Sequence, residues 1–162
     1  MVILSSVGHR QGGIDLSKFS LGGQYHPWAA YGQRKPANVY TASELERRYG
    51  HHGVHAWAVH VGMIRTGLMQ FLDEATLEQW GTDPNIGRLM KNAKQGAATT
   101  VWAATAKVLE GQGGKYLEDC RVAVPAKVEP VGADPGYAPH AYDKSQEVVL
   151  WKRSTDMVRS FL

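Results

Sequence analysis

The chain has 162 residues, of which 43% are apolar and 20% charged, the length and balance of one soluble globular domain. The formal charge of +3 comes from scattered Lys and Arg rather than a basic stripe, so no nucleic acid partner is predicted. The apolar runs are too short for a signal peptide or a membrane helix, and a single cysteine, Cys120, excludes an internal disulfide. We therefore predict a cytoplasmic protein without a membrane span.

The first part of the chain alternates between strand and helix signals. The apolar run at 2–6 predicts a buried strand, and residues 12–27 show no period and predict a loop. Apolar residues at helical intervals over 29–48 predict a helix that Gly50 ends. Residues 54–62 alternate in size and stop at a glycine, which predicts a second strand.

The second part of the chain continues this alternation. Residues 67–91 are mixed, with an amphipathic piece at "DEATLEQW", and Asn92 is a suitable N-cap for a helix over 93–109. The segment "GGKYLEDC" at 113–120 predicts a third strand, and four prolines mark 125–139 as irregular. Asp143 can cap a last helix that runs to about Phe161 and is expected to bury three apolar side chains, Val148, Trp151 and Val158.

The order of these elements predicts an α/β fold. Strands separated by long helices imply right-handed crossovers and a parallel sheet, in which the first strand lacks a partner on one side. Parallel sheets carry their chemistry at the carboxyl ends of the strands. The first two strands end at Ser5 and Ser6 and at Gly62 to Thr66, so we expect a functional site between these two places.

Tyr31 and Lys35 form a candidate acid/base pair on the predicted helix. Residues four apart share one helix face, and a close ammonium favours phenolate and so lowers the pKa of a tyrosine. The hydroxyl of Ser6, at the end of a neighbouring strand, could hold a substrate oxygen against the phenol. By spacing alone the pair is weak evidence, because seven tyrosines and nine lysines can produce it by chance on a solvated surface.

Other reactive residues lead to simpler interpretations. The histidines at 51–60 do not combine with acidic or thiol ligands at zinc-site spacing, so no metal is predicted. Cys120 has no nearby base and is interpreted as a buried structural thiol. His9 lies just past Ser6 and could line a substrate pocket, or it could be a histidine of a surface loop.

Four stretches, "SSVGHRQGGIDL", "WAAYGQRKPANV", "AVHVGMIRTGL" and "KQGAATTVWAAT…GGKYLEDC", occur in the order found in the short-chain dehydrogenase/reductase family. The chain resembles most closely its retinol-dehydrogenase-like and WW-domain-oxidoreductase-like group, over nearly its whole length. The resemblance implies a Rossmann-like three-layer fold that is incomplete, a C-terminal half with about three parallel strands and flanking helices.

The resemblance also implies roles for individual residues. Ser6 would position the carbonyl or hydroxyl, Tyr31 would transfer its proton, and Lys35 would tune Tyr31 and hydrogen-bond the nicotinamide ribose. In "HVGMIRT", Gly62 would let the backbone approach the cofactor, while Ile64 and Thr66 match positions that contact the nicotinamide carboxamide. The sequence departs from the family where Arg34 replaces a small residue, Pro36 follows the lysine and Val61 replaces a proline.

The chain contains no match to the glycine-rich turn that receives a pyrophosphate. We therefore expect residues 1–162 to form a partial short-chain dehydrogenase domain that lacks the N-terminal dinucleotide-binding half. The predicted function is an NAD- or NADP-dependent oxidoreductase that interconverts a small lipophilic alcohol and a carbonyl by hydride transfer. The alternative is a truncated, catalytically silent member that cannot bind cofactor alone. A homo-oligomer or an association with a full-length relative would satisfy the open sheet edge.

Overall fold

The computed structural model describes residues 1–18, 25–127 and 135–161. The helices are α1 (Pro27–Tyr49), α2 (Glu74–Thr82), α3 (Pro84–Leu89), α4 (Ala93–Thr105) and α5 (Lys144–Val158). The strands are β1 (Val2–Leu4), β2 (Trp57–His60), β3 (Met63–Ile64), β4 (Met90–Lys91), β5 (Tyr116–Glu118) and β6 (Arg121–Val122). Short 3-10 helices connect them, among them η1 (Val7–Gln11), η4 (Gly67–Phe71), η5 (Lys107–Leu109), η6 (Pro139–Tyr142) and η7 (Arg159–Phe161).

The main sheet has the strand order β1-β2-β5-β6, and its first three strands are parallel, which confirms the predicted α/β architecture. In register, Ile3 lies beside Ala58, and Val59 lies beside Leu117. Strand β1 stands at the sheet edge, as expected, with β2 on one side only. The predicted burial of this strand was wrong: Val2 and Ile3 are half-buried and Leu4 is 49% exposed, because no strand among the described residues covers the free edge. Because the three strands are parallel, their carboxyl ends lie along one edge of the sheet.

The sequence patterns did not predict β6, which forms a hairpin with β5. Glu118 pairs with Arg121, so the loop between them is the two residues Asp119 and Cys120. Both have positive φ, 46° and 53°, the conformation of a type I′ turn. Aspartate tolerates this left-handed region better than most residues, so the turn is marked by Asp119 rather than by a glycine.

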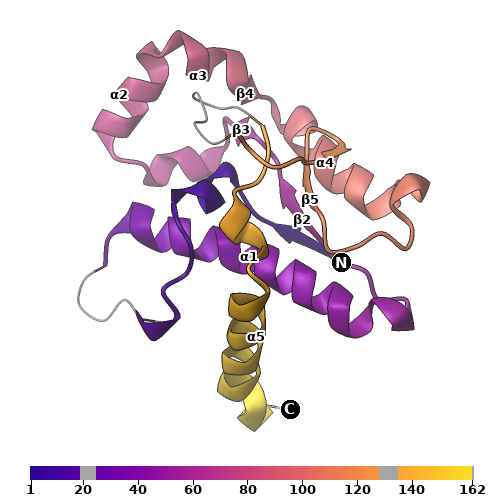
Figure 1. Cartoon of the computed structure of the whole chain (residues 1–162). Helices are drawn as coiled ribbons and strands as arrows, with labels where there is room; N and C mark the ends of the chain where they lie inside the picture. The colour runs from indigo at the N-terminus through magenta and orange to yellow at the C-terminus, as the bar shows by residue number, and fades with distance from the viewer. Residues whose placement is uncertain (19–24, 128–134, 162) are drawn as a thin grey trace.

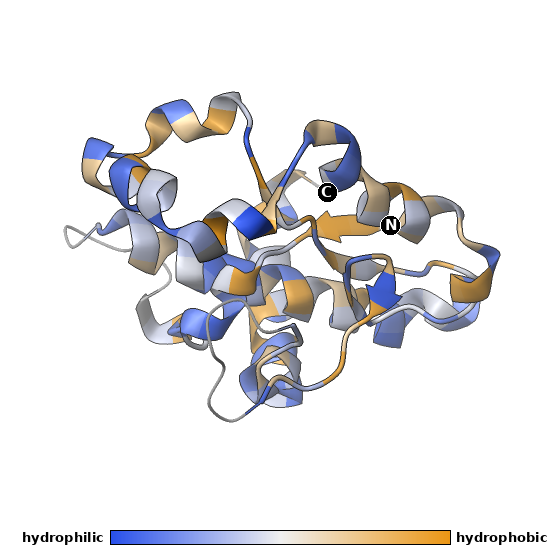
Figure 2. Ribbon diagram, turned by 90° about the horizontal axis from the view of Figure 1, so that it is seen from above, coloured by the Kyte–Doolittle hydropathy of each residue, from blue (hydrophilic) through white to orange (hydrophobic). Residues whose placement is uncertain are grey.

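Helices cover both faces of the sheet. On one face Ala56 and Ala58 pack against Val39 and Ala42 of α1, and on the other Trp57 and Val59 pack against Ala103 of α4. This alternation along β2 makes three layers, helix, sheet and helix (Figure 1). Figure 2 shows the edge strand beside the N-terminus in hydrophobic colours between helices of mixed colour.

Helix α1 runs without interruption through Pro36. It begins with Pro27 in its first turn, where a missing amide proton costs nothing, and has Arg47 and Arg48 in its last turn. Pro36 is buried and cannot donate to the carbonyl of Gly32. The helix predicted over 29–48 is therefore confirmed.

The apolar face expected for the last helix was wrong at two of its three residues. α5 begins at the Asp143 N-cap, as predicted, but it buries Glu147 and Leu150, whereas Val148 and Val158 are 41% and 47% exposed and Trp151 is half-buried. Leu150 packs with Leu16 and with Tyr40 of α1. Figure 1 shows the end of α5 directed away from the sheet.

The mixed segment at 67–91 folds into η4, α2 and α3, and it returns through β4. β4 pairs in parallel with β3, which places Ile64 beside Lys91. Asp73 caps α2 by accepting from the amide of Thr76 at 2.8 Å. None of the helices among the described residues has the length and apolar composition that a bilayer crossing needs.

Candidate functional site

The Ser6 hydroxyl and the Tyr31 ring both lie close to the same small residue, Gly8. A Cβ atom at Gly8 would stand 2.6 Å from Tyr31 Cε1 and 3.6 Å from Ser6 Oγ. Ser6 is buried and caps η1, and its Oγ accepts from the amide of Gly8 at 3.1 Å. The loop after β1 and the first turns of α1 thus bring together the two hydroxyl-bearing side chains that the sequence analysis selected.

Lys35 lies beside Tyr31, as their spacing on one helix predicts. Its Nζ is 4.9 Å from the centroid of the Tyr31 ring and donates to the carbonyl of Leu4 at 3.5 Å. Burial, and then the nearby charge of Arg34, lower the pKa of Lys35. Ser5 Oγ donates to the carbonyl of Lys35 at 2.8 Å, which fixes this turn of α1 against the end of β1.

His9 holds the loop that carries Ser6. Its Nδ1 donates to the carbonyl of Ser6 at 2.7 Å, and its Nε2 accepts from the amide of Ala138 at 3.1 Å. Burial lowers the pKa of His9 to about 4, so the ring is neutral at pH 7, and it packs 4.7 Å from the ring of Tyr116. These contacts join the start of η1 to the segment before η6.

The structure changes the interpretation of His9. The side chain is 0% exposed, so the alternative of a surface-loop histidine is wrong. Both ring nitrogens have backbone partners, which does not favour direct contact with a substrate, and that role stays a prediction. A sequence signal for holding the Ser6 loop was available: His9 lies three residues after Ser6, which is one turn of a 3-10 helix.

Gly62 adopts a conformation that favours glycine. Its φ is +90°, and a Cβ atom there would lie 2.9 Å from Cδ, Cε and Nζ of Lys91. Ile64 packs on α4, because a Cβ at Gly96 would stand 2.1 Å from Ile64 Cδ1. Thr66 is exposed and caps η4 by accepting from the amide of Leu68 at 3.3 Å.

Three of the predicted cofactor residues, Gly62, Ile64 and Thr66, therefore follow the carboxyl end of β2, while Ser6 follows that of β1. Gly62 has no side chain, and the side chain of Lys91 covers its backbone. This is a surface that a cofactor can approach if the Lys91 side chain moves. Sequence reasoning missed Lys91, because only the two-residue pairing of β3 with β4 brings it to Gly62.

Cys120 is a correction to the sequence analysis. It was expected to be buried, but it is exposed, because it occupies the β5–β6 turn. Its backbone amide donates to Thr99 Oγ1 at 3.2 Å. Over the described ranges, no group of three or more His, Cys, Asp and Glu side chains is placed to hold a metal ion.

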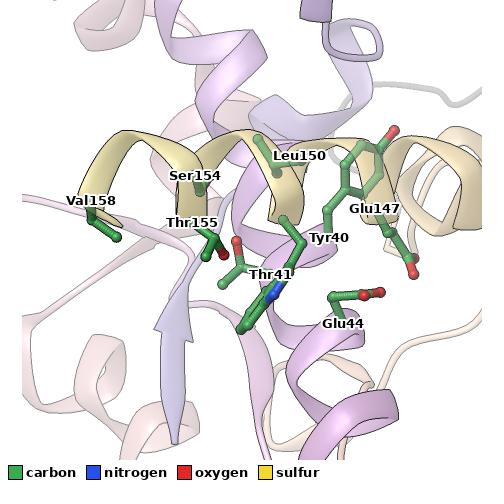
Figure 3. A pocket seen from close by; sticks show the side chains of 9 residues that line it. Tyr40, Thr41, Glu44, Glu147, Leu150, Ser154, Thr155 and Val158 are labelled. Atoms are coloured by element: carbon green, nitrogen blue, oxygen red, sulfur yellow. The ribbon is translucent and has the colours of Figure 1, made fainter. Parts of the chain in front are cut away.

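A cavity of about 290 Å³ lies between α1 and α5, away from the predicted site residues (Figure 3). Four charged side chains, which we call the α1/α5 ion cluster, lie at or beside it: Glu44, Glu147, Arg47 and Arg48. Arg47 is ion-paired with both carboxylates, and Arg48 Nε contacts Glu44 at 2.6 Å. Arg48 also stacks on Trp151, 5.2 Å from the ring. In this cluster the two buried carboxylates are paired with arginines where the two helices meet.

The alignments with three named relatives include almost all of this chain. It is 41% identical over 160 residues to a short-chain dehydrogenase/reductase of Penicillium roqueforti and 40% identical over 164 residues to an oxidoreductase of Penicillium decumbens. It is 32% identical over 171 residues to the WW domain-containing oxidoreductase of Gallus gallus. These alignments include 98%, 98% and 100% of the chain but 46%, 47% and 37% of the relatives. The chain thus spans about half the length of the curated relatives it matches, or less.

A solved structure has a similar fold. The crystal structure of an uncharacterised protein from Mycobacterium paratuberculosis matches 98% of this chain and 49% of its own, with a TM-score of 0.62 and 26% identity. No protein-family model matches the chain. The parallel sheet, the order of the elements and the named relatives agree: over nearly its whole length the chain is similar to part of the short-chain dehydrogenases/reductases.

Proposed function

We propose that this chain carries the proton-transfer site of a nicotinamide-dependent oxidoreductase that interconverts an alcohol and a carbonyl. The observation that carries the proposal is the placement of Ser6 and Tyr31 around Gly8, with the Lys35 ammonium 4.9 Å from the Tyr31 ring. Two hydroxyls and a cation at the carboxyl end of a parallel strand are suited to protonating a substrate oxygen.

Each of the three side chains has a separate role in this proposal. Ser6 Oγ accepts from the amide of Gly8, which leaves its O–H to donate to the substrate oxygen. In the reductive direction Tyr31 gives its phenolic proton to that oxygen, and Lys35 stabilises the phenolate that remains. In the oxidative direction the same phenolate takes the proton back. The nicotinamide, when bound, supplies or accepts the hydride.

The residues that would hold the cofactor are Lys35, at the ribose, and the turn at Gly62, Ile64 and Thr66. Gly62 supports this assignment because its positive φ and missing side chain present bare backbone at the end of β2. The Ile64 side chain is directed at Gly96, so its contribution would come from the backbone.

The proposed substrate is small and lipophilic. Thr66 is followed by η4, which exposes Leu68 and Phe71 at 74% and 77%. Apolar side chains this exposed, directly after the proposed cofactor turn, are suited to contact an apolar substrate. We propose that η4 and α2 determine which alcohol or carbonyl the site accepts.

The 162-residue chain itself provides the test. Fluorescence titration with NADH and NADPH measures cofactor binding, and absorbance of the reduced cofactor measures turnover of a panel of lipophilic aldehydes. Tyr31→Phe should abolish turnover and largely preserve binding, whereas the control Tyr25→Phe, at a tyrosine that is 68% exposed, should change neither. Undiminished turnover in Tyr31→Phe would show that Tyr31 is not the group that transfers the proton.

A second candidate is a chain without turnover of its own that associates with another copy or with a full-length relative. The observation that favours it is the open edge of β1, together with an exposed Leu4 at 49%. Light scattering during size-exclusion chromatography would detect a second copy. A monomer that binds no reduced cofactor at millimolar concentration would contradict both the enzyme and the self-associating form.

A further inference from the structure

Lys91 occupies the space in front of the proposed cofactor turn. Its Cδ, Cε and Nζ all lie 2.9 Å from the point where a Cβ atom of Gly62 would stand. The β3–β4 pairing places Ile64 beside Lys91 and so brings Lys91 next to Gly62, although the two residues are 29 positions apart in the sequence. An ammonium group therefore lies directly on the bare backbone that follows β2.

Asp119 holds this ammonium in place. Lys91 Nζ is ion-paired with Asp119 Oδ1, and this hydrogen bond lowers the pKa of the Asp119 carboxyl. The two side chains are 24% and 59% exposed, and an ion pair this open to water is weak. A ligand with more negative charge than one carboxylate can therefore replace Asp119 at little cost.

The charges around Gly62 favour an anion. Burial, together with the positive charges of Lys91 and Arg10, lowers the pKa of His60 to about 4, so this ring is neutral at pH 7. The acidic groups nearby are Asp119 and Glu118, and burial raises the pKa of Glu118. Arg121 also acts on both carboxyl groups, so three permanent cations stand near one exposed and one buried carboxyl group.

We propose that Lys91 is a binding residue for a diphosphate group and that it exchanges its Asp119 partner for phosphate oxygens when the ligand enters. Lysine binds phosphate as a point charge, and hydrogen bonds between an ammonium and a phosphate are stronger than those between neutral groups. The inference rests on the proposed function, because a diphosphate at the Gly62 turn would belong to a dinucleotide. It also makes Asp119 a competitor for the same ammonium.

The test uses inorganic pyrophosphate as the probe and the ¹⁵N-labelled chain as the receptor. Shifts of the Gly62 and Asp119 amide signals give the dissociation constant. Lys91→Met keeps the aliphatic stem over Gly62 and removes the charge, so binding should weaken about five- to tenfold, a change of about 1–1.4 kcal/mol. Asp119→Asn should strengthen binding about threefold. Lys94→Met, at an exposed lysine on α4, is the matched control and should stay within about twofold.

Three results would overturn the inference. One is the absence of any shift at Gly62 with pyrophosphate, another is equal loss in Lys91→Met and Lys94→Met, and the third is weaker binding in Asp119→Asn. Orthophosphate and NADH titrations of the same proteins show whether the site takes a free phosphate or a dinucleotide. Lys91-dependent pyrophosphate binding without turnover would reject only the proposed oxidoreductase, and turnover without Lys91 dependence would reject only this inference.

Discussion

Gly8 gives a direct test of the geometry around Ser6 and Tyr31. Gly8→Ala would place Cβ 2.6 Å from Tyr31 Cε1 and 2.9 Å from Cδ1, whereas carbon atoms in contact lie about 3.5–4.0 Å apart. The Tyr31 ring must therefore move by about 1 Å. Gly8 is not among the glycines with positive φ, so alanine adds a steric conflict without backbone strain.

The expected loss of stability follows from this displacement. Overpacking a buried site by one methyl group costs about 1–3 kcal/mol, which corresponds to a fall in Tm of about 2–4 °C per kcal/mol for a chain of this size. The control is Gly13→Ala, where a Cβ would meet nothing within 4 Å. It measures the stabilisation of about 0.4–1 kcal/mol that alanine gives by restricting the unfolded chain. If the chain turns over substrate, Gly8→Ala should also lower kcat about 100-fold.

The assay is urea unfolding of a double-mutant cycle. Tyr31→Ala removes the ring, so Gly8→Ala should cost much less in that background than in the unmodified chain. The difference between the two costs measures the contact itself and does not depend on catalysis. Equal costs in both backgrounds, or a Gly8→Ala that behaves like Gly13→Ala, would refute the placement of Tyr31 beside the Ser6 loop.

Two further predictions concern buried charge. Because His9 has a pKa of about 4 when folded against about 6.5 when unfolded, the unfolded chain binds the proton first as pH falls. The contribution of His9 to the free energy of unfolding should therefore fall by about 3 kcal/mol between these values. His9→Gln should remove this part of the pH dependence of the urea midpoint, while the similar contribution of His60 remains. Arg47→Met, which strands the buried carboxylates of the α1/α5 ion cluster, should cost about 2 kcal/mol or more. Arg159→Met, at an exposed pair, should cost about 0.5 kcal/mol or less, and similar urea midpoints for the two arginine variants would contradict the shared role of Arg47.

The sequence predicted those parts of the fold that depend on period and end signals. The helix at 29–48, the Asn92 and Asp143 caps and the parallel order of three strands follow from apolar spacing and capping residues, and the structure confirms them. The buried face of α5 was wrong because carboxylates were excluded from the core. Glu147 is buried because Arg47 of α1 pairs with it, a contact between residues 100 positions apart.

The candidate site also has a part that the sequence predicted and a part that it did not. Tyr31 and Lys35 share a helix face by local geometry, and the structure brings Ser6 to them around Gly8. Lys91 could not be predicted, because two-residue strands such as β3 and β4 carry no period. The exposure of Cys120 depends on an Asp-Cys turn that lacks the usual glycine signal.

The two hydrogen bonds of His9 also affect how the chain can be altered. Because one imidazole links the carbonyl of Ser6 to the amide of Ala138, 129 positions beyond it, the start of η6 acts as a brace for the loop after β1. A protein cut before residue 135 would keep every side chain proposed for proton transfer and lose the brace. A shortened protein should therefore extend at least beyond Ala138, which His9 contacts, and should not end at β6, the last strand of the sheet.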